Sequence, residues 1–152
     1  MKEKIGNVIH METEMDRLVK KKFPIVVDFD GTVVKHHYPT IGEDCPYCVE
    51  TLKKWTNNGV GVILDTMRGG KELEAAKKWF KDKGIPLYGI GAEPNQKEWT
   101  DSPKAYGIFS VDDRNLGVPL IEEEEERPYV DWKEIDKKFS AIILKMAKKY
   151  AE

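Results

Sequence analysis

Short apolar runs alternate with amphipathic stretches along most of the chain. Four of the runs are rich in β-branched or aromatic residues and end at polar or turn residues, which is typical of strands buried on both faces of a parallel sheet. They cover residues 23–27, 60–64, 85–90 and 105–111. The pattern therefore predicts four parallel strands.

Apolar residues at helical spacing fill the stretches between and after these runs. Residues 49–57 and 71–83 form two predicted helices, each followed closely by a glycine that stops it. Another helix is predicted from Asp131, because Asp131-x-x-Glu134 has the spacing of a capping box and the apolar residues beyond it share one face. A further helix is predicted near residues 13–21.

Alternating strands and helices favour a doubly wound α/β fold, in which right-handed crossovers place helices on both faces of a parallel sheet. The length of 152 residues suits a single domain. Within it we expect an N-terminal extension (1–22), a catalytic core (23–115), and a C-terminal part (116–152) made of an acidic loop at 122–126 and the last helix. Ligands of such sheets bind at the carboxyl ends of the strands.

The charge of the chain is nearly balanced, with 25 basic and 27 acidic side chains. This balance gives no overall field that would draw the protein to a membrane, and it disfavours nucleic acid as a partner while leaving room for a local basic patch. The sequence has no apolar run long enough to cross a bilayer and no secretory signal at its start. A cytoplasmic location is therefore expected.

The two cysteines, Cys45 and Cys48, are too few for a fold held together by disulfides, so the core must supply the stability. The tetrapeptide Cys45-Pro46-Tyr47-Cys48 matches the active site of glutaredoxins, and thiol redox activity through Cys45 is one alternative function. A glutaredoxin would carry this tetrapeptide directly after its first strand. Here it opens a later helix, which disfavours the redox function.

The strongest chemical signal is Asp28-Phe29-Asp30-Gly31-Thr32, which follows the first predicted strand. Two carboxylates one residue apart can face one pocket when the chain turns after Asp28, so that one attacks a substrate while the other handles a proton. A calcium loop in this register would need an acid in place of Val26 and a glutamate in place of His37. A plain polar turn is the remaining alternative for this segment alone.

Three other features fall at the ends of predicted strands: Thr66, Lys104 and the pair Asp112-Asp113. In a parallel sheet we expect them to converge with the first motif on one edge. A carboxylate that attacks a phosphoester needs the phosphate charge neutralised by a metal, a lysine and hydroxyl donors. The combination therefore predicts a site for phosphoryl transfer.

In these motifs the chain resembles the haloacid dehalogenase superfamily, whose four motifs correspond to residues 25–33, 62–66, Lys104 and 111–113. The receiver domains of signalling pathways use similar residues in a different order, with the acidic pair first. The resemblance implies a Rossmann-like core and a phosphohydrolase activity. Dehalogenases of the superfamily lack the second acid, so hydrolysis of a phosphomonoester is expected.

By this resemblance Asp28 is the nucleophile that forms an aspartyl phosphate, and Asp30 is the general acid and base. Thr66 is expected to donate a hydrogen bond to the phosphoryl group, and Lys104 to hold Asp28 and that group by its charge. Thr32 and Arg68 are expected at the substrate, with a surface arginine as the alternative for Arg68.

The resemblance also implies a Mg²⁺ ion bound by Asp28, the backbone carbonyl of Asp30, and an acid of the last motif. We expect Asp113 to ligate the ion directly and Asp112 to orient Lys104 or a water molecule on the ion, although the sequence alone leaves their order open. An all-oxygen site with few protein ligands suits magnesium.

Superfamily members usually carry a cap domain after the first motif or between the second and third, but neither gap is large enough here. Residues 33–47 suffice only for a small flap, which His36 and His37 are expected to line. An open site accepts large substrates or borrows a lid from a second subunit, so a homo-oligomer is expected. The substrate should be a phosphorylated metabolite or nucleotide, and a non-hydrolysing phosphoprotein switch or binding module is another alternative.

Overall fold

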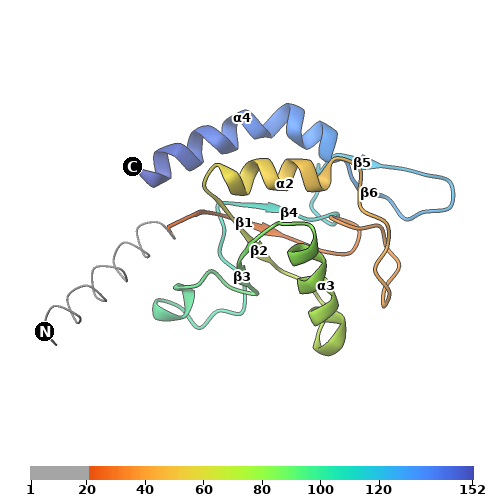
Figure 1. Ribbon diagram of the computed structural model, residues 1–152, viewed down its shortest axis with the longest axis horizontal. Helices are drawn as coiled ribbons and strands as arrows, with labels where there is room; N and C mark the ends of the chain where they lie inside the picture. The colour runs from red at the N-terminus through yellow and green to blue at the C-terminus, as the bar shows by residue number, and fades with distance from the viewer. Residues whose placement is uncertain (1–20) are drawn as a thin grey trace, which may run out of the picture.

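The computed structural model of the protein describes residues 21–152, so the helix expected near residues 13–21 lies almost wholly outside the described part. Its strands and helices alternate along the core in the predicted order (Figure 1). The elements are β1 (Phe23–Val27), α2 (Cys48–Asn57), β2 (Val60–Leu64), α3 (Gly70–Asp82), β3 (Leu87–Ile90), the 3-10 helix η1 (Gln96–Glu98), β4 (Phe109–Val111), β5 (Leu120–Ile121), β6 (Tyr129–Val130) and α4 (Trp132–Ala151).

The central sheet has the strand order β3-β2-β1-β4, and every neighbouring pair is parallel. All five residues of β1 and of β2 are buried, which explains why their sequences are uninterrupted apolar runs. Val27, the last residue of β1, pairs with Leu64 on one side and Val111 on the other. The three strands therefore end together, and the residues that follow them emerge at one edge.

Helices α2 and α4 lie side by side above the sheet (Figure 1). Trp55 of α2 and Trp132 of α4 meet edge to face with ring centroids 5.7 Å apart. The Trp55 indole donates a hydrogen bond to Ser140 Oγ at 3.0 Å, so the polar atom of this buried ring is satisfied. Asp131 caps α4 by accepting from the backbone N–H of Glu134, as the capping box predicts.

The two faces of the sheet are covered differently. One large core joins Ile25 and Val27 of β1 to α2, α3 and α4. On the other face, Val26 and Ile63 pack against Tyr88 of β3 and against Ala105, which belongs to the long crossover from β3 to β4. The predicted α/β class with a parallel sheet is confirmed, but the second face is covered mainly by a crossover that holds only a short 3-10 helix.

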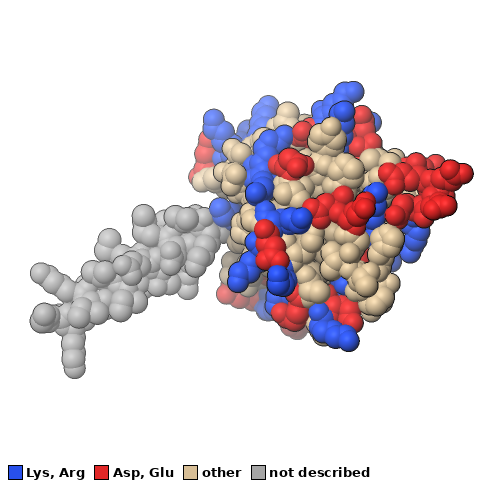
Figure 2. Space-filling model, turned by 45° about the vertical axis from the view of Figure 1, so that its right-hand side comes forward, with Lys and Arg blue, Asp and Glu red and all other residues tan. Residues whose placement is uncertain are grey.

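The C-terminal part contains a hairpin that the sequence pattern does not predict. Strands β5 and β6 pair antiparallel and carry the acidic segment at residues 122–126 in the loop between them. In Figure 1 this loop projects from the right-hand side of the molecule, and Figure 2 shows acidic side chains gathered on a projection at that side. Each strand has two residues, too short for its alternation to be recognised in a sequence.

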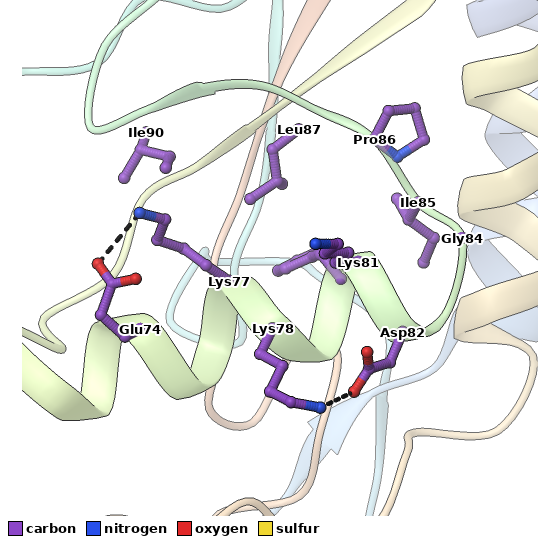
Figure 3. Close-up of a pocket in the computed structure, with 11 residues that line it drawn as sticks. Glu74, Lys77, Lys78, Lys81, Asp82, Gly84, Ile85, Pro86, Leu87 and Ile90 are labelled. Atoms are coloured by element: carbon purple, nitrogen blue, oxygen red, sulfur yellow. Dashed lines mark hydrogen bonds and ion pairs between the residues drawn. The ribbon is translucent and has the colours of Figure 1, made fainter.

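A surface hollow of about 820 Å³ lies between α3 and the edge strand β3 (Figure 3). Its apolar side is formed by Ile85, Leu87 and Ile90, and Lys77 and Lys81 of α3 stand opposite them. None of the aspartates singled out in the sequence lines this hollow.

Among residues 21–152, none of the helices is both long enough and apolar enough to cross a membrane.

Helix α4 is tied to the loop after β1 by one buried hydrogen bond, from the Trp132 indole to the backbone carbonyl of Thr32 at 2.6 Å. Trp132→Phe should lower the free energy of unfolding by about 1–3 kcal/mol, because it leaves this carbonyl without its donor. Urea unfolding followed by circular dichroism measures the change. Trp99→Phe is the matched control, since Trp99 is 61% exposed, and an equal loss in both variants would contradict the prediction.

Candidate functional site

The chain leaves β1 through a tight turn that starts at Asp28. The backbone N–H of Asp28 still bonds to the carbonyl of Val111 at 3.0 Å, whereas Thr32 N–H turns back to the carbonyl of Phe29 at 3.1 Å. Gly31 has a positive φ of 79°, and a Cβ at this position would collide with the imidazole of His36. The turn thus requires glycine for its backbone conformation and for the close approach of His36.

Three carboxylates meet at this edge of the sheet. Asp28, Asp112 and Asp113 each present an oxygen, and the three oxygens lie within 4.8 Å of one another. Burial, followed by the nearby charge of Asp112, raises the pKa of Asp28 to about 8. Burial also raises the pKa of Asp112. Negative charges held this close together are the environment in which a divalent cation stabilises ionised carboxylates.

The cluster is held in place by Thr32 and His36. The Thr32 hydroxyl donates to Asp28 Oδ2 at 3.0 Å and accepts from the backbone N–H of Asp113 at 3.1 Å. His36 Nε2 lies 2.8 Å from Asp113 Oδ2. Burial would raise the pKa of Asp113, but the contact with His36 and those with the neighbouring aspartates outweigh it, and the pKa is lowered.

Asp30, the second acid of the turn, does not join the cluster. Both of its oxygens accept from Arg68, with Nε to Oδ2 and Nη2 to Oδ1 each at 2.7 Å. The side chain of Arg68 is only 1% exposed, so this pair is almost sealed from water on the arginine side. The structure therefore brings Arg68 into the site, but against Asp30 instead of toward open solvent.

Thr66 and Lys104 differ in how close they come to the site. Thr66 follows β2, and its hydroxyl accepts from the backbone N–H of Arg68 at 3.1 Å. Lys104 is exposed, and among residues 21–152 its side chain forms no ion pair with an acid. The structure does not bring Lys104 to the acid cluster.

The position of Lys104 follows from where β4 begins. The chain joins the amino end of β1 at Ile108, whose backbone N–H bonds to the carbonyl of Pro24 at 2.8 Å. Pro24 lies four residues before Asp28, which is about 13 Å along a strand. Lys104 comes before this junction, at the amino end of β4, whereas Asp112 and Asp113 follow the carboxyl end. A lysine that precedes a parallel strand lies at the opposite edge of the sheet from acids that follow it, so the expected convergence of Lys104 with the acids is wrong.

The cysteines of the Cys45-Pro46-Tyr47-Cys48 segment are both free and buried. Burial raises the pKa of Cys45 to about 12 and the pKa of Cys48 well above its ordinary value. Both belong to the main core beneath helix α2. A reactive thiol needs exposure and a lowered pKa, so this segment has the character of core packing.

His36 is the site residue whose role the sequence describes least well. A histidine in the flap is predicted, but its contact with Asp113, 77 residues further along the chain, depends on the turn at Gly31. The pair formed by Arg68 and Asp30, which are 38 residues apart, likewise depends on how the chain folds and not on local sequence. In the sequence, the only sign of either contact is a polar residue close to the end of a predicted strand.

Comparison with known proteins gives one solved structure that resembles the whole fold. No protein-family model matches the chain, and none of the curated proteins matches it. The structure of a conserved protein from Bacteroides thetaiotaomicron is 33% identical in sequence and superposes with a TM-score of 0.61. The match covers 84% of this chain and 91% of the bacterial protein, so it includes nearly all of that protein.

The buried charge of Asp28 predicts a pH-dependent stability in the metal-free protein. An aspartate in an unfolded chain loses its proton near pH 4, whereas Asp28 in the fold keeps it up to about 8. Between these values the folded state binds more protons, so stability falls as pH rises. Asp28→Asn removes this loss and should raise the free energy of unfolding at neutral pH by roughly 1–3 kcal/mol.

Urea unfolding in a chelator, repeated across this pH range, measures the difference. The gain should grow with pH, and added Mg²⁺ should stabilise the wild type more than Asp28→Asn. Asp65→Asn is the control, because Asp65 is an exposed aspartate at the end of the neighbouring strand. A variant less stable than the wild type at neutral pH would contradict this account of Asp28.

The two thiols should be unreactive in the folded protein. With Cys45 at a pKa of about 12 and Cys48 fully buried, Ellman's reagent should release almost no chromophore at about pH 8. In denaturant both thiols should react within minutes. Rapid reaction of one thiol in the folded protein would instead support the redox alternative.

Proposed function

This chain belongs to one family with the conserved Bacteroides thetaiotaomicron protein, and from the acid cluster of its fold we propose that it is a Mg²⁺-dependent phosphomonoester hydrolase of the haloacid dehalogenase type. The observation that carries the proposal is the convergence of Asp28, Asp112 and Asp113 within 4.8 Å at the carboxyl edge of the sheet. Asp30 follows two residues after the nucleophile position, as in the first motif of the superfamily that the chain resembles.

The donor set fits magnesium. It consists of carboxylate oxygens, and it carries more negative charge than the neighbouring side chains neutralise. Asp28, Asp112 and Asp113 would hold the ion, together with the Asp30 backbone carbonyl expected from the motif. When bound, Mg²⁺ supplies positive charge that offsets the repulsion between the phosphate dianion and the attacking carboxylate.

Asp28 would attack the phosphorus atom in line with the leaving group. Thr32 donates to Oδ2 of this carboxylate and so fixes its orientation. The bond between Asp28 and phosphorus forms as the bond from phosphorus to the ester oxygen breaks, and that oxygen keeps the electron pair and takes a proton from Asp30. Water then attacks the phosphorus atom, gives its proton to Asp30, and releases Asp28 and phosphate.

The phosphoryl oxygens need donors besides the ion. Thr66 lies at the end of β2, next to β1, and its hydroxyl is expected to donate to one of them. Lys104 lies before the amino end of β4, at the opposite edge of the sheet from the cluster, so its side chain alone does not span the distance that its expected role requires. The proposal therefore rests on the aspartates and on Thr66 more than on Lys104.

Only the flap would contact the leaving group. Among the described residues, the segment between Asp30 and α2 is this flap, and the segment between β2 and β4 contains only α3, β3 and η1. A phosphorylated metabolite or nucleotide fits such an uncapped site. The homo-oligomer expected from the missing cap stays a prediction, as does the cytoplasmic location.

Hydrolysis of p-nitrophenyl phosphate tests the proposal directly. The wild type should release p-nitrophenol with Mg²⁺ and lose this activity in a chelator, and Asp28→Asn should lower kcat by at least about 10³-fold because the nucleophile is gone. Asp65→Asn, an exposed aspartate beyond β2, is the control and should keep its rate.

Two results would contradict the hydrolase. If Asp28→Asn is as active as the wild type, Asp28 is not the nucleophile. If the wild type accumulates a phosphorylated Asp28 without turnover, the protein is a phosphoprotein switch on the same fold. Mass spectrometry of the acid-quenched protein separates these outcomes.

A further inference from the structure

A buried arginine joins Asp30 to the flap. Besides its two bonds to the Asp30 carboxylate, Arg68 donates from Nη2 to the carbonyl of Thr40 at 2.8 Å and from Nη1 to the carbonyl of Pro39 at 3.1 Å. Its guanidinium also contacts two rings, 5.0 Å from the centroid of Phe29 and 5.2 Å from that of Tyr38. The guanidinium is therefore held by two aromatic rings and by acceptors along its edge.

This arrangement determines the direction of the Asp30 carboxylate. A guanidinium that binds both oxygens of a carboxylate sets the plane of the group as well as its position, which a single hydrogen bond does not do. Each carboxylate oxygen has a second lone pair, so it is able to accept a hydrogen bond from another donor. The Asp30 carboxylate is thus presented in a defined orientation, with both oxygens held by one guanidinium.

We propose that Arg68 is a positioning residue that orients Asp30 as the base for hydrolysis of phosphorylated Asp28. The inference rests on the proposed function and concerns its second step. In that step the oxygen of water forms a bond to phosphorus while the bond from phosphorus to Asp28 breaks and its electron pair returns to the Asp28 carboxylate. The proton of the water moves to Asp30, which gives it to the leaving oxygen of the next substrate.

The flap takes part in this arrangement through its backbone. Pro39 and Thr40 provide two acceptors for the same guanidinium, and Tyr38 covers its outer face while remaining 62% exposed. A change in the flap that frees Arg68 would also free the Asp30 carboxylate. The orientation of the Asp30 carboxylate therefore depends on the flap keeping its contacts with Arg68.

Rapid mixing with p-nitrophenyl phosphate in Mg²⁺ buffer separates the two steps. The p-nitrophenolate ion leaves without a proton, so formation of phosphorylated Asp28 does not need Asp30, whereas its hydrolysis does. Arg68→Lys keeps the charge but replaces the fork by a point donor. It should keep the rate of the first turnover within about threefold and lower the steady-state rate by roughly 10²-fold, the lower end of what a positioned base contributes.

The expected signature is a burst of about one p-nitrophenol per protein molecule, with phosphorylated Asp28 detected by mass spectrometry after an acid quench. Tyr38→Ala leaves the buried ion pair intact but removes the outer ring, and it should show the same burst with a smaller steady-state loss. Arg127→Lys is the matched control, because Arg127 is exposed, and it should behave as the wild type.

Equal losses in the first turnover and in the steady state would overturn the inference, because they would show general damage to the site. An unchanged steady-state rate in Arg68→Lys would also overturn it. If Arg68→Lys does not fold, as judged by circular dichroism, Tyr38→Ala decides by the same criteria. If the wild-type protein shows no turnover that depends on Asp28, the proposed function is overturned, and this inference with it.

Discussion

The repulsion between carboxylates at the carboxyl edge of the sheet is the constraint that organises the surrounding residues. Parallel strands that end in register bring Asp28 and the pair Asp112 and Asp113 to one place, whatever their separation in sequence. Burial makes their charges more costly, which the raised pKa of Asp28 expresses. Such an edge destabilises the fold unless the charges are neutralised, and a bound cation would neutralise them.

Asp30 shows how the same turn keeps a fourth carboxylate out of this repulsion. Only one residue separates it from Asp28, yet its partner is the guanidinium of Arg68, which comes from the loop after β2. The turn thus places Asp28 in the acid cluster that suits a cation and places Asp30 against an arginine. Two carboxylates close in sequence acquire different chemistry because their neighbours differ.

The C-terminal helix contributes to the site although it carries none of the acids. Trp132 binds the carbonyl of Thr32, and the Thr32 hydroxyl binds both Asp28 and the backbone of Asp113. The packing of α4 on α2 through Trp55 therefore fixes the turn from the side away from the solvent. The sequence predicts that α4 packs on the domain but gives no sign that it supports the turn at Asp28.

Sequence patterns predict what depends on local periodicity and on the order of strands. The bounds of β1 and β2 and the convergence of Asp28 with Asp112 and Asp113 follow from buried apolar runs in a parallel sheet. The position expected for Lys104 does not, because a residue that precedes a parallel strand lies at the amino edge of the sheet, whereas the acids follow their strands at the carboxyl edge. Apolar periodicity indicates which residues are buried, but not which residues pair with a neighbouring strand. The predicted strand therefore begins at residue 105, where the crossover already packs on the sheet, whereas β4 begins at Phe109.

The pair of Arg68 with Asp30 shows the second kind of limit. Each residue stands at the end of a predicted strand, so their proximity is predictable, but the direction of each side chain is not. That direction depends on the flap, whose carbonyls at Pro39 and Thr40 accept hydrogen bonds from the guanidinium. A buried arginine with so many acceptors is held in one conformation, and for this reason we infer that its function is to orient Asp30 and not to capture the phosphate.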